Sequence, residues 1–419
     1  MVAANHIRLE LVASPPCEVY RPRAVNPAPC SEIAFLSQSG GRLVPITGFI
    51  AAAAVVGFAT NLSMHLLNLR MQAMGLSGFE IGASVAIQAL GVSFAAPVTK
   101  HIIGRFGVRA AILSGALLSS LALIAFTSLA ELAAWNAVRF GFGAGLAVLF
   151  TASESLIISR ADGGNRSRIV GWYATALAAG TAAGPLLVTM IGIQGSAPLL
   201  WGALLFWLAT GPIVACLKPG EELAPVVRKS TFATLRFAPV AFVSAFVFGV
   251  ADNGGMAMLS VYSVLSGYDY MNAVVLAVFA TLGAIVLQIP LGYSASRHDP
   301  RVLLLLCGIG SILLLTLLPA IVSVKPIAFG VAFGLGGLLE GLYTVGLICV
   351  AKSYRGIGIS TANGYFISMC GLGELTGPLA TGLSMEYLGA SGFVLSLVAT
   401  LVAYVLLIAW IKQPIGTTR

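Results

Sequence analysis

Charged side chains inside long apolar runs are the first candidates for chemistry in this sequence. They are Arg139, Glu154, Asp252, Glu340 and Glu374. A charge at the centre of a membrane helix costs about 2.5–3.5 kcal/mol on insertion scales, so such groups usually line a pathway or pair with one another. A carboxyl group also changes its proton affinity when it moves between apolar surroundings and contact with a cation. These residues therefore indicate a proton-handling site or, as the simpler alternative, a static ion pair.

The composition places these charges in a membrane protein. The chain has 419 residues, of which 58% are hydrophobic and only 9% are charged, whereas about 25% of the residues of a soluble domain are charged. This excludes a cytosolic enzyme, a secreted disulfide scaffold and a nucleic-acid-binding domain. The six cysteines form no Cys-x-x-Cys pair and show no metal-ligand spacing with histidine, so we expect no metal and no cofactor.

Apolar runs separated by short polar breaks predict an all-α membrane protein with twelve transmembrane helices. Each run is close to the length of about 20 residues that a bilayer requires. The predicted spans are 46–68, 79–99, 110–130, 133–156, 169–193, 197–217, 237–260, 271–295, 301–323, 326–350, 361–385 and 390–411.

The basic residues predict the orientation of these spans. Twenty of the 23 lysines and arginines fall on the side that holds both termini, while Arg70 and Lys325 fall on the other side and Arg139 lies within a span. Cytoplasmic loops carry an excess of basic residues, so both termini, including the tails 1–45 and 413–419, are expected in the cytoplasm. The net charge of +8 is then a topology signal and gives no reason to expect nucleic acid as a partner.

An internal repeat divides the chain into two halves. The stretch GFATNLSM from Gly57 matches GVADNGGM from Gly249, which lies 192 residues later. The element G-x-x-x-G-P-L from Gly180 recurs from Gly373 with an offset of 193 residues. We therefore predict two parallel six-helix repeats, 46–217 and 237–412, joined by a cytoplasmic loop at 218–236.

This plan resembles the major facilitator superfamily. The loop after the second span is similar to the family signature Gly-x-x-x-Asp-Arg-x-Gly-Arg-Arg through Arg105, Gly107 and Arg109. It departs from that signature at Lys100 and Gly104, which replace the leading Gly and the Asp. The resemblance covers residues 46 to 412 and implies a solute site between the halves, near the middle of the bilayer.

Two further elements support the same resemblance. Arg139, Gly143 and Gly145 look like the family's Arg-x-x-x-Gly-x-Gly element in the fourth span. The Gly-Pro element from Gly180 resembles one associated with proton antiporters, but Val188 stands where that element closes with glycine. Because the same element also occurs in the second half, tight helix packing is its simplest role.

The family fold implies that spans one, four, seven and ten line a central cavity. This would place Arg139, Asp252 and Glu340 around one aqueous space. Our hypothesis is that Asp252 or Glu340 carries the proton and that Arg139 is its partner. The repeat supports this choice, because Asp252 replaces Thr60 of the first half and Glu340 replaces Ala147.

Other polar residues are candidates for the same pathway. Asn61 and His65 lie one turn apart on the first span, although a lone histidine is more often only a satisfied hydrogen-bonding group. Tyr343 lies one turn beyond Glu340. Glu374 lies within the Gly-Pro element of the eleventh span, where a hydrogen bond to the opposing half explains it as well as a solute contact does.

A second group of residues is expected at a gate. By family analogy, Glu154 lies near Arg105 and Arg109 at the cytoplasmic end and latches the closed gate, and Arg297 repeats Arg105 in the second half. This role is a structural switch more than a binding contact.

The expected function is ion-gradient-driven, most simply proton-coupled, transport of a small and largely neutral organic solute by a monomer in the lipid bilayer. No convincing ATP-binding motif occurs. Uptake of a vitamin-like compound such as riboflavin is one form of this function, proton-antiport efflux of drugs or metabolites is the alternative, and a sensor without flux is a third. An enzyme would need a nucleophile–base pair or a metal cluster, and four dispersed histidines provide neither.

Overall fold

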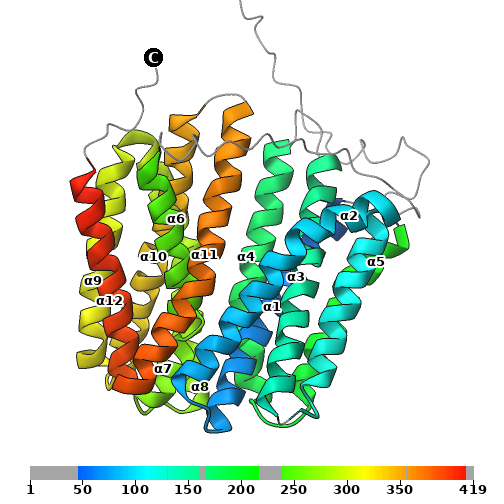
Figure 1. Ribbon diagram of the computed structural model, residues 1–419, viewed down its shortest axis with the longest axis horizontal. Coiled ribbons are helices and arrows are strands. Elements are labelled where there is room, and N and C mark those ends of the chain that lie inside the picture. Colours follow the sequence, from blue (N-terminus) through cyan, green and yellow to red (C-terminus); the bar gives the residue numbers. More distant parts are fainter. Residues whose placement is uncertain (1–45, 130, 161–165, 217–237, 355–356, 412–419) are drawn as a thin grey trace, which may run out of the picture. The chain divides into compact units, whose positions relative to one another are not determined.

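The computed structural model describes residues 46–129, 131–160, 166–216, 238–354 and 357–411. These residues form helices and no strand (Figure 1). The helices of the first half are α1 (Ile46–Ala73), α2 (Gly78–Ala125), α3 (Leu132–Arg160), α4 (Arg166–Ile191) and α5 (Ala197–Cys216). Those of the second half are α6 (Pro239–Ala251), the π-helix η3 (Asp252–Met256), α7 (Leu259–Leu265), α8 (Tyr270–Arg297), α9 (Pro300–Ile321), α10 (Lys325–Ser353), α11 (Ile357–Leu388) and α12 (Ala390–Trp410).

The predicted spans coincide with these helices except in two places. α2 contains both the second and the third predicted spans, 79–99 and 110–130, which are joined by a break in helix geometry at Gly107 and not by a longer loop. Gly107 has φ 81° and ψ 165°, a conformation that glycine adopts at little cost. The span expected as one helix at 237–260 is divided into α6, η3 and α7. The predicted tails 1–45 and 413–419 and the loop 218–236 lie outside the described residues.

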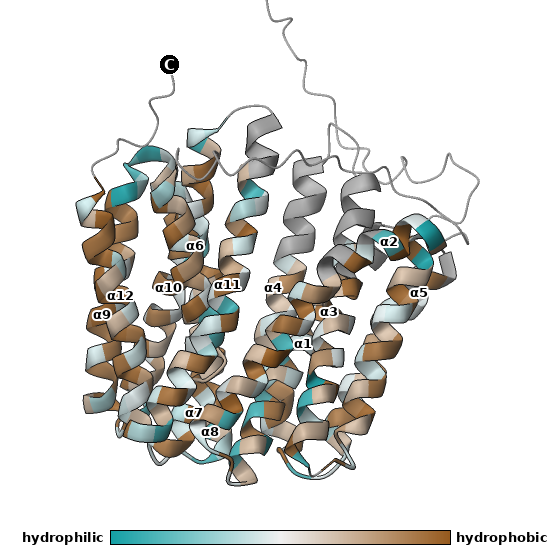
Figure 2. Cartoon of the chain, viewed as in Figure 1, coloured by the Kyte–Doolittle hydropathy of each residue, from teal (hydrophilic) through white to brown (hydrophobic). Residues whose placement is uncertain are grey.

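Apolar side chains cover the outward faces of the described helices. Eight helices among the described residues are long and apolar enough to cross a membrane, and Thr175–Ile191 and Ala197–Gly211 are shorter apolar helices. Large side chains such as Met190, Ile289 and Trp410 are more than three-quarters exposed. Figure 2 shows hydrophobic residues along most of the described lengths of the helices. Such a surface is stable when it faces lipid, and a helix satisfies its own backbone hydrogen bonds there.

Local capping signals determine where several helices begin. Ser77 and Glu80 form a capping box before α2, in which the Glu80 amide donates to Ser77 Oγ at 3.3 Å and the Ser77 amide donates to Glu80 Oε2 at 2.8 Å. Asp299 caps α9, and Pro300 follows it in the first turn. Both arrangements satisfy amide groups that the first helical turn leaves without partners.

The two halves share the same close helix packing. In each contact a Cβ added to a glycine would collide with a carbonyl oxygen of the neighbouring helix, so only glycine permits the approach. The matched contacts are Gly180 on Ala54 and Gly373 on Phe246, Gly184 on Phe58 and Gly377 on Val250, and Gly91 on Phe140 and Gly283 on Phe333. The Gly-Pro elements of α4 and α11 thus pack against α1 and α6, which agrees with the packing role expected for them.

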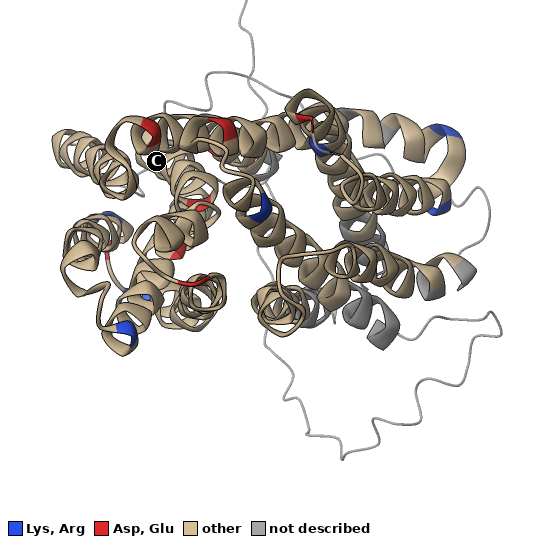
Figure 3. Cartoon of the chain, turned by 90° about the horizontal axis from the view of Figure 1, so that it is seen from below, with Lys and Arg blue, Asp and Glu red and all other residues tan. Residues whose placement is uncertain are grey.

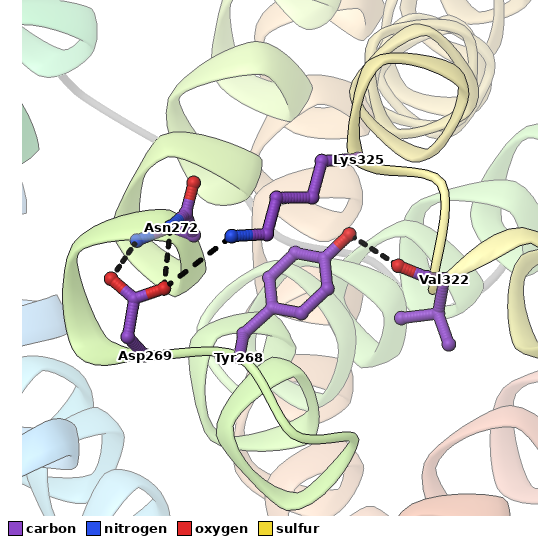
Figure 4. Close-up of polar contacts among 5 residues, drawn as sticks. All are labelled: Tyr268, Asp269, Asn272, Val322 and Lys325. Carbon is purple, nitrogen blue, oxygen red and sulfur yellow. Dashed lines mark hydrogen bonds and ion pairs between the residues drawn. The ribbon is translucent and has the colours of Figure 1, made fainter.

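A polar cluster joins two turns of the second half (Figure 4). We call the end of the bundle where α1 ends and α2 begins the outer end, after the predicted orientation; the α7–α8 and α9–α10 turns also lie there. Asp269 accepts hydrogen bonds from the amide and the side chain of Asn272 and lies 3.7 Å from Lys325 Nζ. Tyr268 Oη donates to the Val322 carbonyl at 2.6 Å. Together these contacts fix the turn before α8 to the turn before α10.

The glycine contacts predict a clear difference between two glycine substitutions. Gly283→Ala should lower the free energy of unfolding by about 1–3 kcal/mol, because its Cβ would meet the Phe333 backbone, which cannot move independently. Gly330→Ala on α10 is the matched control, because nothing lies within 4 Å of its Cβ and alanine favours a helix. Thermal unfolding of the purified proteins in detergent measures both, and equal melting temperatures would contradict the packing argument.

The outer-end cluster predicts a pH-dependent stability difference. Hydrogen bonds from Asn272, aided by Lys325, hold the pKa of Asp269 below its ordinary value. A lowered pKa stabilises the fold above the pKa of the unfolded chain, and the stabilisation is lost as pH falls through the folded pKa. Asp269→Ala should therefore cost about 0.5–1 kcal/mol at pH 7, and the cost should shrink below about pH 4.

The control for this prediction is Asp269→Asn, which keeps a capping oxygen but removes the charge. At pH 7 it should unfold between the wild type and Asp269→Ala, and its stability relative to Asp269→Ala should change little with pH. A cost for Asp269→Ala that stays constant down to pH 3 would show that the carboxylate charge contributes nothing.

Candidate functional site

The two halves are in contact at the outer end. Gly78 and Gly82 of α2 pack against Gly382 and Pro378 of α11 at distances that only glycine allows. Ser77 Oγ donates to Glu386 Oε2 at 3.1 Å across the same contact. These contacts close the outer end of the interface between α2 and α11.

A cavity of about 410 Å³ lies between the halves. Its volume is within the range of about 300–1,000 Å³ that is usual for small-molecule sites. Helices of both halves line it, namely α1, α4, α6, η3, α8 and α10. The lining residues are Thr60, Asn61, Met64, His65, Leu177, Ala178, Thr181, Phe248, Asp252, Met256, Ala257, Ala280, Thr281, Ala284, Ile285, Gln288, Gly336, Leu339 and Glu340.

Two of the predicted carboxylates face this cavity together. Asp252 and Glu340 both line it, from η3 and from α10. Charged residues are sparse along the described helices (Figure 3), so two carboxylates at one cavity stand out. Thr60, the counterpart of Asp252 in the first half, also lines the cavity. The repeat thus brings an uncharged and a charged version of one position to the same space.

The backbone at Asp252 departs from regular helix geometry. Asp252 begins η3, where the Ala257 amide donates to the Asp252 carbonyl at 3.0 Å, one residue further than in an α-helix. Such π-helical turns occur frequently at functional sites. The paired glycines Gly254 and Gly255 lie inside this turn, and Gly254 packs against the Gly377 backbone of α11. The division of the predicted seventh span therefore occurs at its only carboxylate.

The two polar residues expected on the first span, now α1, reach the same cavity. Asn61 and His65 line it. His65 is almost fully buried, and its Nδ1 lies 3.5 Å from Ser260 Oγ on α7. A contact between α1 and α7 joins the two halves, so His65 belongs to the interface as well as to the cavity wall.

Tyr343 lies beside the cavity, within an aromatic cluster. Its ring centroid is 5.0 Å from that of Phe248, which does line the cavity, and 5.3 Å from that of the buried Phe366. Tyr343 is therefore not a lining residue itself, and it contacts the site through the ring of Phe248.

The structure places Glu374 at a helix contact within the second half. Asn253 Nδ2 donates to the Glu374 backbone carbonyl at 3.4 Å, and the adjacent Gly373 packs on the α6 backbone. Glu374 is not among the residues that line the cavity. This contact involves only the backbone carbonyl of Glu374, so the hydrogen bond expected from its side chain to the opposing half stays a prediction.

Arg139 does not join the two carboxylates, contrary to the expected arrangement. It is fully buried within the first half and donates to Asn68 Oδ1 at 2.6 Å, to Gln88 Oε1 at 3.1 Å, and to Ser84 Oγ and Met71 Sδ at 3.3 Å. The physical reason is the glycine packing of α3 on α2, where Gly143 contacts the Gln88 backbone. This packing directs the fourth span away from the cavity, and α4 and α8 line it instead.

The residues expected at the gate lie away from the cavity. Arg105 is exposed and lies over the Phe106 ring, with 5.6 Å from its guanidinium carbon to the ring centroid. Arg109 is half-buried. Arg297 at the end of α8 lies 4.3 Å from the Tyr293 ring centroid. The side chain of Glu154 lies outside the described residues, so its expected contact with Arg105 and Arg109 stays a prediction.

Sequence reasoning missed the contribution of α8. Thr281 and Gln288 supply polar groups to the cavity, and Phe248 of α6 supplies an aromatic surface. A signal was present, because Gln288 is a side-chain amide in a run of apolar residues from 273 to 291. Only its place in the wall of the cavity that Glu340 also lines distinguishes it from a buried structural amide.

Comparison with known proteins assigns the family. The family model described as Major Facilitator Superfamily matches residues 46–335, which is more than half of the chain. The chain belongs to the Major Facilitator Superfamily. It is thus a transporter that spans the membrane several times and carries a small-molecule solute.

Individual relatives of this transporter are distant. It is 24% identical over 350 residues to an uncharacterized MFS-type transporter, YfkF of Bacillus subtilis (strain 168), a match that covers 80% of this chain and 88% of YfkF. The crystal structure of a point mutant of the nucleoside transporter NupG has a TM-score of 0.76 at 11% identity, covering 88% of this chain and all of NupG. A bacterial homolog of the human lysosomal transporter Spinster, in an inward-facing and occupied conformation, has a TM-score of 0.70 at 13% identity, covering 87% and 96%. These structures share the fold of this transporter.

Proposed function

We propose that this transporter couples the movement of a small organic solute to protons, and that Asp252 and Glu340 bind the proton. The observation that carries the proposal is the presence of two carboxyl groups in the wall of one cavity between the halves. Carboxyl groups are costly inside a membrane protein and are retained where they serve a pathway. A carboxyl that alternates between a closed, apolar site and water can load and release a proton.

The wall of the cavity limits the charge of the solute. Among the described residues that line it, Asp252 and Glu340 are acidic and none is lysine or arginine. An anionic solute would meet these carboxylates without a compensating cation. The proposed solute is therefore neutral or positively charged, and the burial of Arg139 away from the cavity strengthens this choice.

The remaining wall suits a partly aromatic solute with hydroxyl or amide groups. Phe248 offers a ring face, and Asn61, Thr281 and Gln288 offer hydrogen bonds. Riboflavin is one vitamin-like compound of this kind. A nucleoside, the cargo named for NupG, is another. Uptake of such a compound is the form of the function that we propose.

Efflux by proton antiport would use the same carboxylates but gains no support from the structure. The glycines of the element that suggests it, Gly180 and Gly184 of α4, pack against α1, and Thr181 between them lines the cavity but carries no charge and indicates no direction of transport. Rescue of an auxotroph by the expressed transporter would support uptake, whereas protection against an added toxic compound would support efflux.

The charge of the cavity predicts the outcome of a binding panel. Purified transporter is heated with riboflavin, uridine, tetraphenylphosphonium or benzoate, which represent neutral, cationic and anionic compounds. A compound that binds only the folded state adds about 2.7 kcal/mol of stability at 100 times its Kd. We expect stabilisation by a neutral or cationic compound and none by benzoate. Stabilisation by benzoate alone would contradict the proposed solute class.

The two carboxylates predict a loss of proton-driven transport. With the compound that binds in the panel as radiolabelled tracer, vesicles with an imposed pH gradient should accumulate it through the wild-type transporter. Asp252→Asn and Glu340→Gln should each reduce this accumulation toward the level of protein-free vesicles, because the amide cannot carry the proton. Tracer exchange without a gradient should persist in at least one variant.

Glu131→Gln is the matched control for this prediction. Glu131 is exposed and lies outside the cavity, so replacing its carboxyl group by an amide leaves the site unchanged. This variant should accumulate tracer like the wild type. Undiminished proton-driven accumulation by both Asp252→Asn and Glu340→Gln would overturn the proposal.

A further inference from the structure

Asn68 forms a bridge between the two halves in the interior of the transporter. Its side chain is fully buried near the end of α1. Its Nδ2 donates to the Ala257 carbonyl in the second half at 2.8 Å, and its Oδ1 accepts from Arg139 Nη2 of the first half at 2.6 Å. Both ends of the amide are therefore occupied, one by each half.

The chemistry of its two partners determines which way the amide points. A guanidinium group only donates hydrogen bonds, and a backbone carbonyl only accepts them. The oxygen of Asn68 must face Arg139, and its nitrogen must then face Ala257. The other acceptors around Arg139, such as Gln88 and Ser84, hold the guanidinium in place from the side of α2. Among the hydrogen bonds of Arg139 to described residues, the one to Asn68 is thus the one that leads to the second half.

The carbonyl that Asn68 contacts belongs to the break between η3 and α7. The Ala257 amide donates to the Asp252 carbonyl at 3.0 Å, and the Met258 amide donates to the Gly255 carbonyl at 3.1 Å. Ala257 also lines the cavity. One residue therefore connects the backbone of Asp252, the cavity wall and the buried amide of the opposing half.

We propose that Asn68 is a positioning residue that holds the outer end closed, with Arg139 fixing the orientation of its amide. This inference rests on the proposed solute transport, in which the cavity opens in turn to each side of the membrane, and it assigns a role that the cavity lining does not provide. For α1 and α7 to separate at the outer end, the bond from Asn68 to Ala257 must break. Because Ala257 is bonded to the start of η3, a rearrangement of η3 around a bound solute would move the acceptor of this bond.

The test uses a substitution that separates the two contacts of Asn68. Asn68→Asp keeps an oxygen for Arg139, and the carboxylate pairs well with a guanidinium. It removes the donor and places an oxygen against the Ala257 carbonyl, so the contact between the halves is lost while Arg139 stays satisfied. Asn68→Leu, of similar size, removes both contacts and serves as a second variant.

The readout is the distance across the outer end. Spin labels are attached to cysteines at Ala73 and Leu265, which are exposed at the ends of α1 and α7, after the six native cysteines are replaced by alanine. Pulsed electron paramagnetic resonance on the full chain in lipid nanodiscs then gives the distribution of distances without added solute. We expect Asn68→Asp to raise the ratio of long to short distances by roughly five- to tenfold, as the loss of one buried hydrogen bond would.

Ser84→Ala is the matched control, because it removes one contact of Arg139 at 3.3 Å and leaves the bond from Asn68 to Ala257 intact. Its distance distribution should equal that of the wild type. Wild-type distances in Asn68→Asp would overturn the proposal, as would equal shifts in Asn68→Asp and Ser84→Ala. If Asn68→Asp does not fold, Asn68→Leu decides in the same way. Since the measurement involves neither solute nor proton, the proposed coupling can fail while this result stands, and the reverse is also possible.

Discussion

The absence of water from the bilayer interior is the constraint on which the rest of this structure depends. A polar group placed there must find its partner within the protein. Helices satisfy their own backbones, and glycines allow pairs of helices to approach until little space remains between them. Charged residues are therefore rare inside the membrane, and each one is expected to have either a structural role or a role in transport. A role in transport is expected for the charged residues that line the cavity between the halves.

Because the two halves repeat the same helix packing, the positions at which they differ are easy to identify. The same glycine contacts join α1 with α4 and α6 with α11, and α2 with α3 and α8 with α10. Within this shared scaffold the first half places Thr60 at the cavity and the second half places Asp252 there. The second half therefore supplies both carboxylates of the cavity wall, and the first half supplies the polar groups of α1.

Arg139 shows how a buried cation can act at a distance from the cavity. In the first half it is surrounded by neutral acceptors from α1 and α2, and among the described residues no carboxylate lies within ion-pair distance of it. Burying a cation in this way is costly unless its hydrogen bonds are made, and here they are made by two amides, a hydroxyl and a thioether. The side-chain amide of Asn68 joins Arg139 to the second half, because it accepts a hydrogen bond from Arg139 and donates one to the Ala257 carbonyl.

The amino-acid order alone determined the membrane class, the helical segments, the repeat and the presence of carboxylates in the seventh and tenth spans, because these depend on local hydropathy and on spacing along the chain. The same information could not locate Arg139, since the glycine packing of α3 on α2 decides which way it points. It also could not foresee the π-helical turn at Asp252 or the contribution of Gln288. Those depend on contacts between residues far apart in the chain, and only the tertiary structure decides them.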